Sequence, residues 1–258
     1  MRILGLDFGT KTVGVAVSDS PTGPFVDPIG KPLVSDDMTD NGARGWWNDI
    51  DPTALIDQNG QAWLCWGNGT CFMAKLKPNM IELDGEIKVI DLPGYVEGPY
   101  LHYRNGIYYL TYAGMGKNFS ENIQYATATS MEGPWTPQGE LTGAAENSFT
   151  IHPAVVEYKD KWYLFYHDSS LSGGVNHQRC VMFREITYNE DVAKLSVVGA
   201  GMMSNPGVAA KMFEALYNSR ININMISTSE IRITVLVDEK DVDRAVLAVH
   251  DEFVSRME

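Results

Sequence analysis

The chain has 258 residues, of which 44% are hydrophobic and 21% charged, and this composition excludes disordered, collagen-like and disulfide-stapled proteins. The formal net charge of −13 argues against a protein that holds a nucleic-acid backbone, because such binding depends on clustered Lys and Arg. No run of roughly 18 apolar residues predicts a membrane span, and Asp7 interrupts the place where a signal peptide would be apolar, so we expect a cytoplasmic protein without membrane or nucleic-acid partners.

The first twenty residues, MRILGLDFGTKTVGVAVSDS, predict two strands, Ile3 to Leu6 and Val13 to Val17, on either side of a Gly-Thr-Lys turn. This segment resembles the opening of Holliday-junction resolvases with a ribonuclease-H-like fold. The resemblance implies that Asp7 matches a metal-binding catalytic carboxylate of that family. Two-metal phosphoryl chemistry requires several carboxylates, and the later sequence does not match the family's other ligands. We therefore expect residues 1–20 to be a fused strand pair without nuclease activity.

An internal repeat of three copies occupies residues 51–167. In each copy a Pro opens an apolar run, a polar turn follows, and an aromatic strand comes next, so each copy predicts a β-hairpin. The strand centres, Leu64, Leu110 and Leu164, recur at roughly 50 residues, close to the period of propeller blades, which are four-stranded sheets. The copies are DPTALIDQNGQAWLCWG (51–67), EGPYLHYRNGIYYLTYA (97–113) and IHPAVVEYKDKWYLFYH (151–167).

A second echo links SPTGPF at residues 20–25 with SMEGPW at residues 130–135. Both segments combine Ser, Gly and Pro, which is typical of a turn. We expect each to be a turn after an outer strand of a blade.

Three polar side chains stand at or near the openings of the repeat copies. The first strand of a propeller blade lines the central channel, so Asp51, Glu97 and His152 are expected to converge there. Buried charge is costly without a partner or a function, which favours a functional site. The alternative is that Asp51 and Glu97 only cap turns at the strand starts.

Several motifs, in order along the chain, resemble glycoside hydrolase family 43, whose members are five-bladed propellers that include arabinofuranosidases and xylosidases. The resemblance runs from about Gly14 to about Glu190. Its motifs are WWNDIDP (46–52), YVEGPY (95–100), the two Gly-Pro-aromatic turns and SFTIHP (148–153).

This resemblance implies an inverting mechanism and a carbohydrate partner that contains arabinose or xylose. Glu97 matches the general acid that protonates the leaving glycosidic oxygen, and Asp51 matches the carboxylate that tunes and orients the acid. The aromatic side chains are expected to stack on sugar faces, although core packing is an equally good interpretation of each. The residues expected to contact the substrate are Arg179, Trp46, Trp47, Phe149 and His152.

The third acid of the family, the general base, belongs to an Asp-Pro motif in the first blade, upstream of all the motifs named above, and we recognise no such upstream blade in this sequence. Asp7 is followed by Phe8 and does not match it. Residues 14–190 suffice for about three blades at roughly 50 to 60 residues each. We therefore expect a partial propeller without hydrolase activity, whose open sheet edges favour self-association.

Two alternatives leave the chain active. In one, a second chain completes the ring. In the other, a carboxylate between residues 14 and 45 replaces the base; the candidates are Asp27, Asp36, Asp37 and Asp40.

From residue 191 onwards the hydrophobic period changes. Val192 to Val198 predicts a strand, the polar Ser204-Asn205-Pro206-Gly207 segment predicts a helix start, and Val208, Met212 and Leu216 line one helix face. Alternating apolar residues predict strands at 221–223 and 231–237, and an amphipathic pattern predicts a second helix at 242–253. The predicted order is βαββα.

This segment resembles the C-terminal ACT module of aspartokinases through SVVGAGM (196–202), NPGVAAKMF (205–213) and MISTSEI (225–231). The resemblance implies a ferredoxin-like α+β module that pairs with another and holds an amino-acid effector at their interface. A helix N-terminus offers free N–H groups to a carboxylate. The residues expected to contact the effector are Ser204, Pro206, Gly207, Val208 and Ala209. The sequence shows no partner module and no fourth strand.

No metal and no cofactor are predicted. Cys65, Cys71 and Cys180 have no metal-ligand spacing and predict free thiols. Gly199-Ala200-Gly201 lies between a strand and a helix, but Ser204 occupies the third glycine position of a dinucleotide-binding motif.

We interpret the chain as composite, with mostly β structure. The expected parts are a resolvase-like strand pair at 1–20, a partial propeller of about three blades at 21–190, and an ACT-like module at 191–258. Whether such a chain is natural or engineered is left open by the sequence.

Overall fold

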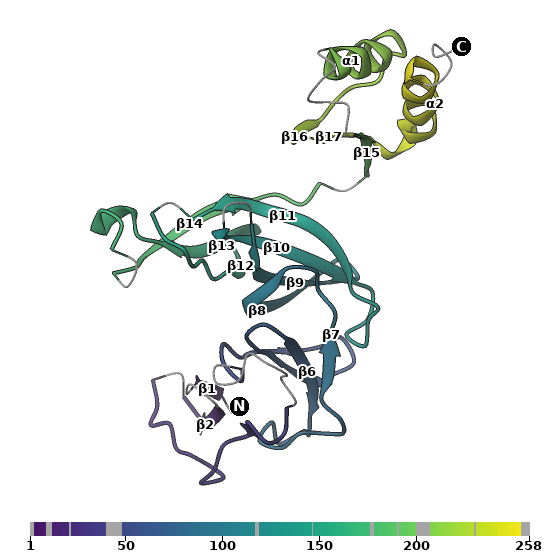
Figure 1. Ribbon diagram of the computed structural model, residues 1–258. Coiled ribbons are helices and arrows are strands. Elements are labelled where there is room, and N and C mark those ends of the chain that lie inside the picture. Colours follow the sequence, from purple (N-terminus) through teal and green to yellow (C-terminus); the bar gives the residue numbers. More distant parts are fainter. Residues whose placement is uncertain are drawn as a thin grey trace. The chain divides into compact units, whose positions relative to one another are not determined.

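The computed structural model describes residues 3–8, 12–20, 22–39, 48–116, 119–145, 147–175, 178–189, 191–199, 207–229 and 231–253. The chain divides into two compact units, Met1–Ile186 and Thr187–Glu258. The first unit is built of strands, whereas the second contains the helices α1 and α2 (Figure 1). Within the described residues, no helix has both the length and the apolar character that a membrane crossing requires.

The described strands of the first unit form antiparallel sheets that follow the chain order. Two sheets have four strands, in the orders β4-β5-β6-β7 and β11-β10-β9-β8, and two have three strands, β1-β2-β3 and β12-β13-β14. This is the mostly β, blade-like architecture that the repeat predicts. The strands are β1 (Ile3–Phe8), β2 (Thr12–Ser18), β3 (Val34–Ser35), β4 (Thr53–Ile56), β5 (Ala62–Trp66), β6 (Cys71–Leu76), β7 (Lys88–Ile90), β8 (Tyr95–Arg104), β9 (Ile107–Met115), β10 (Glu121–Ala128), β11 (Thr136–Ala144), β12 (Ala154–Tyr158), β13 (Lys161–Asp168) and β14 (Cys180–Ile186).

The three repeat copies are hairpins, as predicted: β4 pairs with β5, β8 with β9, and β12 with β13. Asn105 and Gly106 have φ of 47° and 85°, and Lys159 and Asp160 have φ of 51° and 62°. Positive φ at both central residues is the type I′ turn, whose twist matches that of the flanking strands. The turn chemistry therefore fixes the register of these hairpins.

The sheets pack on one another through hydrophobic clusters, and β5 shows why. Its alternate side chains point to opposite faces of the sheet. Leu64 and Trp66 join a cluster with β2 and β3, whereas Trp63 and Cys65 join a cluster with β8 and β9. The sheet β4–β7 is therefore covered on both faces, as a blade between two neighbours is.

The last sheet of the first unit is covered on one face. Leu164 of β13 packs against Ile123 of β10. On the other face of the same sheet, Phe165 and Phe183 stack with ring centroids 5.7 Å apart and are exposed.

The strand pair predicted in residues 1–20 is present as β1 and β2, in register from Ile3–Ser18 to Phe8–Val13. It is part of the first unit, because Val13 and Val15 share a core cluster with β5 and β6. Its apolar residues thus serve the packing of the neighbouring sheet.

The Gly-Pro turns form as predicted, but they precede the outermost strand instead of following it. Gly133 donates its N–H to Ser130 O at 2.9 Å, and Gly23 donates to Ser20 O at 3.0 Å. In the sheet β8–β11 this turn follows the third strand, β10, and leads into the outermost strand, β11. Among the cysteines, Cys65 and Cys71 are buried free thiols, and Cys180 is a partly buried one.

The second unit is a small α+β module. Its elements are β15 (Val192–Val198), α1 (Val208–Asn218), β16 (Met225–Ser229), β17 (Arg232–Asp238) and α2 (Val242–Phe253). The antiparallel sheet has the order β15-β17-β16. Met212 and Leu216 of α1 and Val249 of α2 pack on Val235 and Val237 of β17.

Two predicted boundaries in this unit are wrong. The second strand begins at Met225 instead of Ile221, because Ile221 turns into the core directly after α1 and Asn222 donates to Oδ1 of Asn224 at 2.8 Å. Helix α1 begins at Val208 with Gly207 as its N-cap, so it starts after the Ser204-Asn205-Pro206 segment, which lies outside the described residues.

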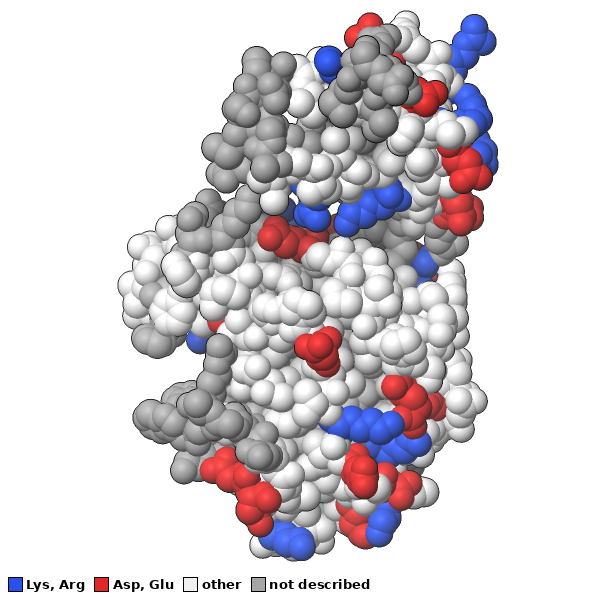
Figure 2. Space-filling model, turned by 45° about the vertical axis from the view of Figure 1, so that its right-hand side comes forward, with Lys and Arg blue, Asp and Glu red and all other residues white. Residues whose placement is uncertain are grey.

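The surface carries mixed charge. On the face that Figure 2 shows, Lys and Arg side chains lie among Asp and Glu side chains. The ion pairs Lys77–Glu82 and Lys161–Glu185 at 2.6 and 2.8 Å are of this kind. Exposed pairs like these contribute little to stability because water and salt screen them.

Candidate functional site

Irregular backbone positions each of the three polar side chains that the repeat singles out. Asp51 precedes β4 and has a left-handed φ of 54°. Glu97 lies in β8 between two register shifts of the β8–β9 pairing, and Gly98 after it has φ of 61°. His152 precedes β12. Bulges and sparsely populated backbone conformations re-aim side chains, and they cluster at functional sites.

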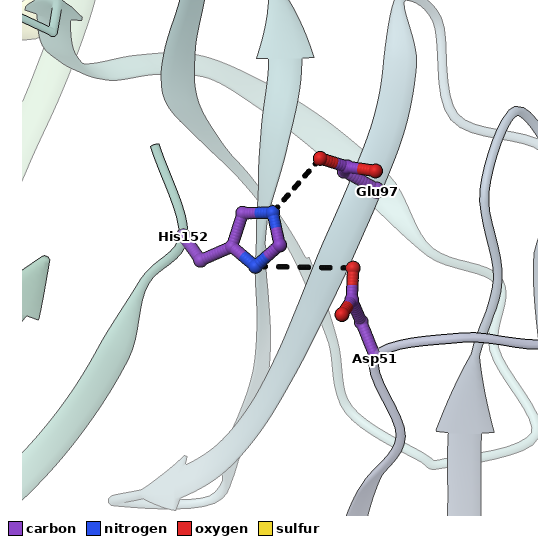
Figure 3. Close-up of side chains that lie close together, drawn as sticks. All are labelled: Asp51, Glu97 and His152. Atoms are coloured by element: carbon purple, nitrogen blue, oxygen red, sulfur yellow. Dashed lines mark hydrogen bonds and ion pairs between the residues drawn. The ribbon is translucent and has the colours of Figure 1, made fainter. Parts of the chain in front are cut away.

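The three side chains converge, with the imidazole of His152 between the two carboxylates (Figure 3). Nε2 of His152 lies 2.9 Å from Oε1 of Glu97, and Nδ1 lies 3.8 Å from Oδ2 of Asp51. The amide of Asn68 donates to the other oxygen of Glu97, Oε2, at 2.7 Å. Glu97 is thus held from both of its oxygens.

Glycine is required beside Glu97. A Cβ built on Gly98 would lie 3.0 Å from Cγ of His152, and its φ of 61° belongs to the left-handed region that side chains rarely adopt. The imidazole ring therefore packs directly on the backbone that carries the acid.

A buried carboxylate anchors the segment that carries Asp51. Asp49 is fully buried and accepts hydrogen bonds from Nε1 of Trp66 at 2.8 Å and Oγ1 of Thr39 at 3.0 Å. Burial raises the pKa of Asp49, although these two donors partly offset the effect. The backbone N–H of Gly67 also donates to Ile50 O at 2.9 Å. The position of Asp51 is therefore set by β5 and the turn after it.

The electrostatics of the site favour a charged imidazole. Burial by itself would lower the pKa of His152, but the hydrogen bond to Glu97 and the charges of Asp51 and Glu97 outweigh it and raise that pKa. Burial raises the pKa of Asp51, and His152 opposes this rise. Oδ2 of Asp51 is buried without a hydrogen-bond partner among the described residues. Such an unsatisfied buried atom points to function, because packing alone would not retain it.

The structure also adds two ionisable residues that sequence reasoning missed. Glu121, the first residue of β10, is 7% exposed and accepts a hydrogen bond from the N–H of Ile151 at 3.1 Å. His167 contacts Oγ1 of Thr150 at 3.2 Å, and its ring centroid lies 5.3 Å from that of His152. Glu121 lies outside the repeated motifs, whereas His167 ends the third copy and could have been found there.

The remaining predicted residues of the first unit are distributed as follows. Arg179 is exposed, but its positive charge helps to lower the pKa of the Asp51 and Glu121 carboxyls against larger opposing effects of burial. Phe149 is 51% exposed and lies three residues before His152. Trp46 and Trp47 lie outside the described residues.

In the second unit, the predicted effector residues fall on both sides of the described boundary. Gly207 is the N-cap of α1 in a left-handed conformation, and Val208 and Ala209 are its first two residues. Ser204 and Pro206 lie outside the described residues.

One ligand atom each of Asp51, Glu97 and His152 lies within 4.8 Å of the others, a spacing that a cation could also use. The hydrogen bond between His152 and Glu97 accounts for the closeness without an ion. The cluster is therefore an ion pair of His152 with the two carboxylates, hydrogen-bonded at Glu97.

Comparison with known proteins divides the chain in the same way. The model of glycosyl hydrolases family 43 matches residues 6–192, and a model of the ACT domain matches residues 195–253. The arabinoxylan arabinofuranohydrolase of Bacillus subtilis (strain 168) is 31% identical over 209 residues. These residues make up 69% of this chain but 40% of the relative.

The aspartokinase of Corynebacterium glutamicum is 53% identical over 68 residues, which are 26% of this chain and 16% of that enzyme. Among solved structures, an α-L-arabinofuranosidase from Clostridium thermocellum superposes with a TM-score of 0.62 at 31% identity. The match covers 74% of this chain and 66% of that one. This chain thus spans less than two thirds of the length of each of these relatives.

The expected resolvase-like segment finds no support, and the family 43 match already begins at residue 6, within β1, and includes all of β2. The burial of Val13 and Val15 against β5 and β6 agrees with that. The chain belongs to the glycosyl hydrolases of family 43 and joins this region to an ACT domain.

Proposed function

We propose that the family 43 region binds a carbohydrate containing arabinose or xylose at the Asp51–Glu97–His152 site and does not hydrolyse it. The observation that carries this proposal is the convergence of the three side chains on one imidazole, at 2.9 and 3.8 Å. Glu97, once protonated, would donate a proton to a glycosidic oxygen, and Asp51 would orient it. Arg179 and Phe149 would contact the sugar.

Hydrolysis with inversion needs more than these residues. A second carboxylate must stand roughly 6.5 to 9.5 Å from the acid, so that a water molecule fits on the opposite face of the sugar. Asp51 and Glu97 approach the same ring, with ligand atoms within 4.8 Å of one another. This spacing suits a carboxylate that tunes the acid, and it leaves too little room for the attacking water.

Glu121 is not suited to act as the general base either. A general base must reach the water that it activates. Glu121 is 7% exposed and its Oε2 already accepts the N–H of Ile151, so this buried carboxyl is not placed to hold a water molecule against the sugar. We therefore assign Glu121 no role in activating water.

The competing hypothesis, an active hydrolase, rests on a substitute base between residues 14 and 45. Asp27 closes its own turn by accepting the N–H groups of Ile29 and Gly30 at 2.9 and 2.8 Å. Asp37 accepts the hydroxyl of Ser35. Asp40 lies outside the described residues.

Asp36 is the one of these candidates that a specific observation favours. Its charge helps to raise the pKa of the buried Asp49, which places it close to the segment that carries Asp51. Asp36 is therefore the residue to substitute if hydrolysis is found.

The test combines binding and turnover on the full chain. Titration with arabino- and xylo-oligosaccharides should give saturable binding, and Arg179→Ala should weaken it about tenfold, while Arg104→Ala, a substitution away from the cluster, should not. Aryl α-L-arabinofuranoside and aryl β-D-xyloside should not be turned over. Turnover that Glu97→Gln abolishes would overturn the proposal, and its further loss in Asp36→Asn would identify the base.

For the second unit we propose amino-acid binding by the ACT domain, at the N-terminus of α1. Among the described residues, no side chain caps this helix start, and the N–H groups of a first helical turn can bind a carboxylate. Lysine or threonine should raise the melting temperature of this unit, whereas sugars should not. Equal melting temperatures with and without amino acids would contradict this assignment.

A further inference from the structure

Glu121 is a buried acid that the proposed chemistry does not use. It is the first residue of β10, 7% exposed, on the sheet that also carries Glu97 in β8. Burying a carboxyl costs free energy, so its retention at the edge of the site calls for a reason.

Three contacts join Glu121 to the segment that leads into β12. Its backbone N–H donates to Phe149 O at 3.4 Å, and its backbone O accepts from the N–H of Ala145 at 3.3 Å. Its side chain accepts the N–H of Ile151 at 3.1 Å. The side-chain bond is the last of these contacts before His152.

Core packing and the backbone of Gly98 also restrain this segment. Ile151 is 1% exposed and belongs to the core cluster of Ile123, Val155 and Leu164. The ring of His152 itself lies against the backbone of Gly98, where an added Cβ would come within 3.0 Å of the ring. The Glu121–Ile151 bond thus fixes the backbone immediately before the imidazole that contacts Glu97.

Charged groups face the Glu121 carboxyl from three directions. Glu97 belongs to β8, His152 to the segment before β12, and Arg179 to the segment before β14. Glu97 opposes ionisation of Glu121, whereas His152 and Arg179 favour it. In return, the negative charge of Glu121 helps to raise the pKa of His152.

We propose that Glu121 is a positioning residue of this site, which holds the backbone of Ile151 and thereby sets the place and the charge of the His152 imidazole against Glu97. The proposal rests on the proposed function, since it takes the Asp51–Glu97–His152 cluster to be the functional site. It concerns the imidazole and not turnover, so it stands or fails independently of hydrolysis.

The test follows the imidazole resonances by NMR, which is practical because the chain has five histidines. The full chain is labelled, the His152 signals are assigned by their loss in His152→Gln, and pH titrations are recorded for wild type, Glu121→Gln and Glu121→Ala. Gln keeps an oxygen that accepts the Ile151 N–H but carries no charge, whereas Ala loses both. Glu140→Gln, an exposed position on the neighbouring strand β11, is the matched control.

In Glu121→Gln we expect the Ile151 amide and His152 ring signals to stay near their wild-type positions, with a downward shift of the His152 titration midpoint. In Glu121→Ala we expect both signals to move, with faster exchange of the Ile151 amide. Glu140→Gln should match wild type. An unchanged His152 midpoint in Glu121→Gln overturns the proposal, and this variant decides the question even if Glu121→Ala fails to fold. If the wild-type chain does not bind the sugars while these NMR results hold, the proposed function alone is contradicted.

Discussion

The two units of the chain differ in what they bury. The first unit buries ionisable side chains, among them Asp49, His102 and Glu121, whereas the described core of the second unit is apolar apart from Thr234. The hydroxyl of Thr234 is paired with that of Ser196 at 2.8 Å. The interior of the second unit is thus filled by apolar packing, whereas the burial of carboxylates and imidazoles lowers the stability of the first unit.

Truncation of the second unit's core should have the largest effect. Leu216 is fully buried, at 0% exposure. Leu216→Ala should therefore lower the free energy of unfolding of this unit by about 3 kcal/mol, through lost burial and the cavity left behind. Chemical denaturation followed by methyl signals of the second unit measures this. Val246→Ala, at a 46% exposed position of α2, is the control and should change little.

Substitution of Glu121, the buried acid of the first unit, should instead raise the free energy of unfolding. The folded pKa of Glu121, about 7, lies above its ordinary value of 4.5, so between these pH values the folded state keeps a proton that the unfolded state has lost. Wild-type stability therefore falls as the pH rises from 4.5 to 7, by at most about 3 kcal/mol. Glu121→Gln should remove this fall and be the more stable protein at pH 8.

Denaturation of both proteins at pH 4 and pH 8 measures the difference. The two should be nearly equal at pH 4, where Glu121 is protonated in both states. If the wild type is as stable as Glu121→Gln at pH 8, burial of the charged Glu121 carboxyl costs no stability. The difference between the two units in the cost of their buried groups would then be smaller.

A smaller effect is expected where the imidazole meets the backbone. Gly98→Ala adds a side chain at positive φ and within 3.0 Å of the His152 ring, so it should cost about 1 to 2 kcal/mol and weaken sugar binding. Gly106→Ala has the same backbone strain, with φ of 85° and no atom within 4 Å of the added Cβ. It should reduce stability by a similar amount and leave sugar binding intact, which calorimetric titration can separate.

The smallest effect lies at the end of α1 in the second unit. Arg220 has φ of 55°, a conformation that glycine adopts without steric cost, and many helices end on glycine there. Arg220→Gly should raise the free energy of unfolding by about 0.5 kcal/mol, because the relief of strain exceeds the added entropy of the unfolded chain. Arg220→Ala, which keeps the Cβ, should show no such gain.

The repeat and the periodicity predicted most of the fold. The hairpins at 51–67, 97–113 and 151–167 follow from local turn chemistry, and β15 and the two helices of the second unit follow from apolar spacing. The strand at Met225 was misplaced because Ile221 and Ile223 alternate like a strand but serve as core anchors after the helix. Periodicity records which residues are buried, and not always in which conformation.

Position in the repeat was also enough to predict that Asp51, Glu97 and His152 come together, because each stands at or near the opening of one repeat copy and equivalent positions of blades face one another. The roles of Glu121 and Asn68, and the burial of Oδ2 of Asp51 without a hydrogen bond among the described residues, became visible only in the folded structure. These depend on contacts between residues far apart in the chain, such as the 29 positions between Asn68 and Glu97, which no local pattern encodes. Local chemistry sets the elements, while burial and charge in the assembled sheets decide what each polar group can do.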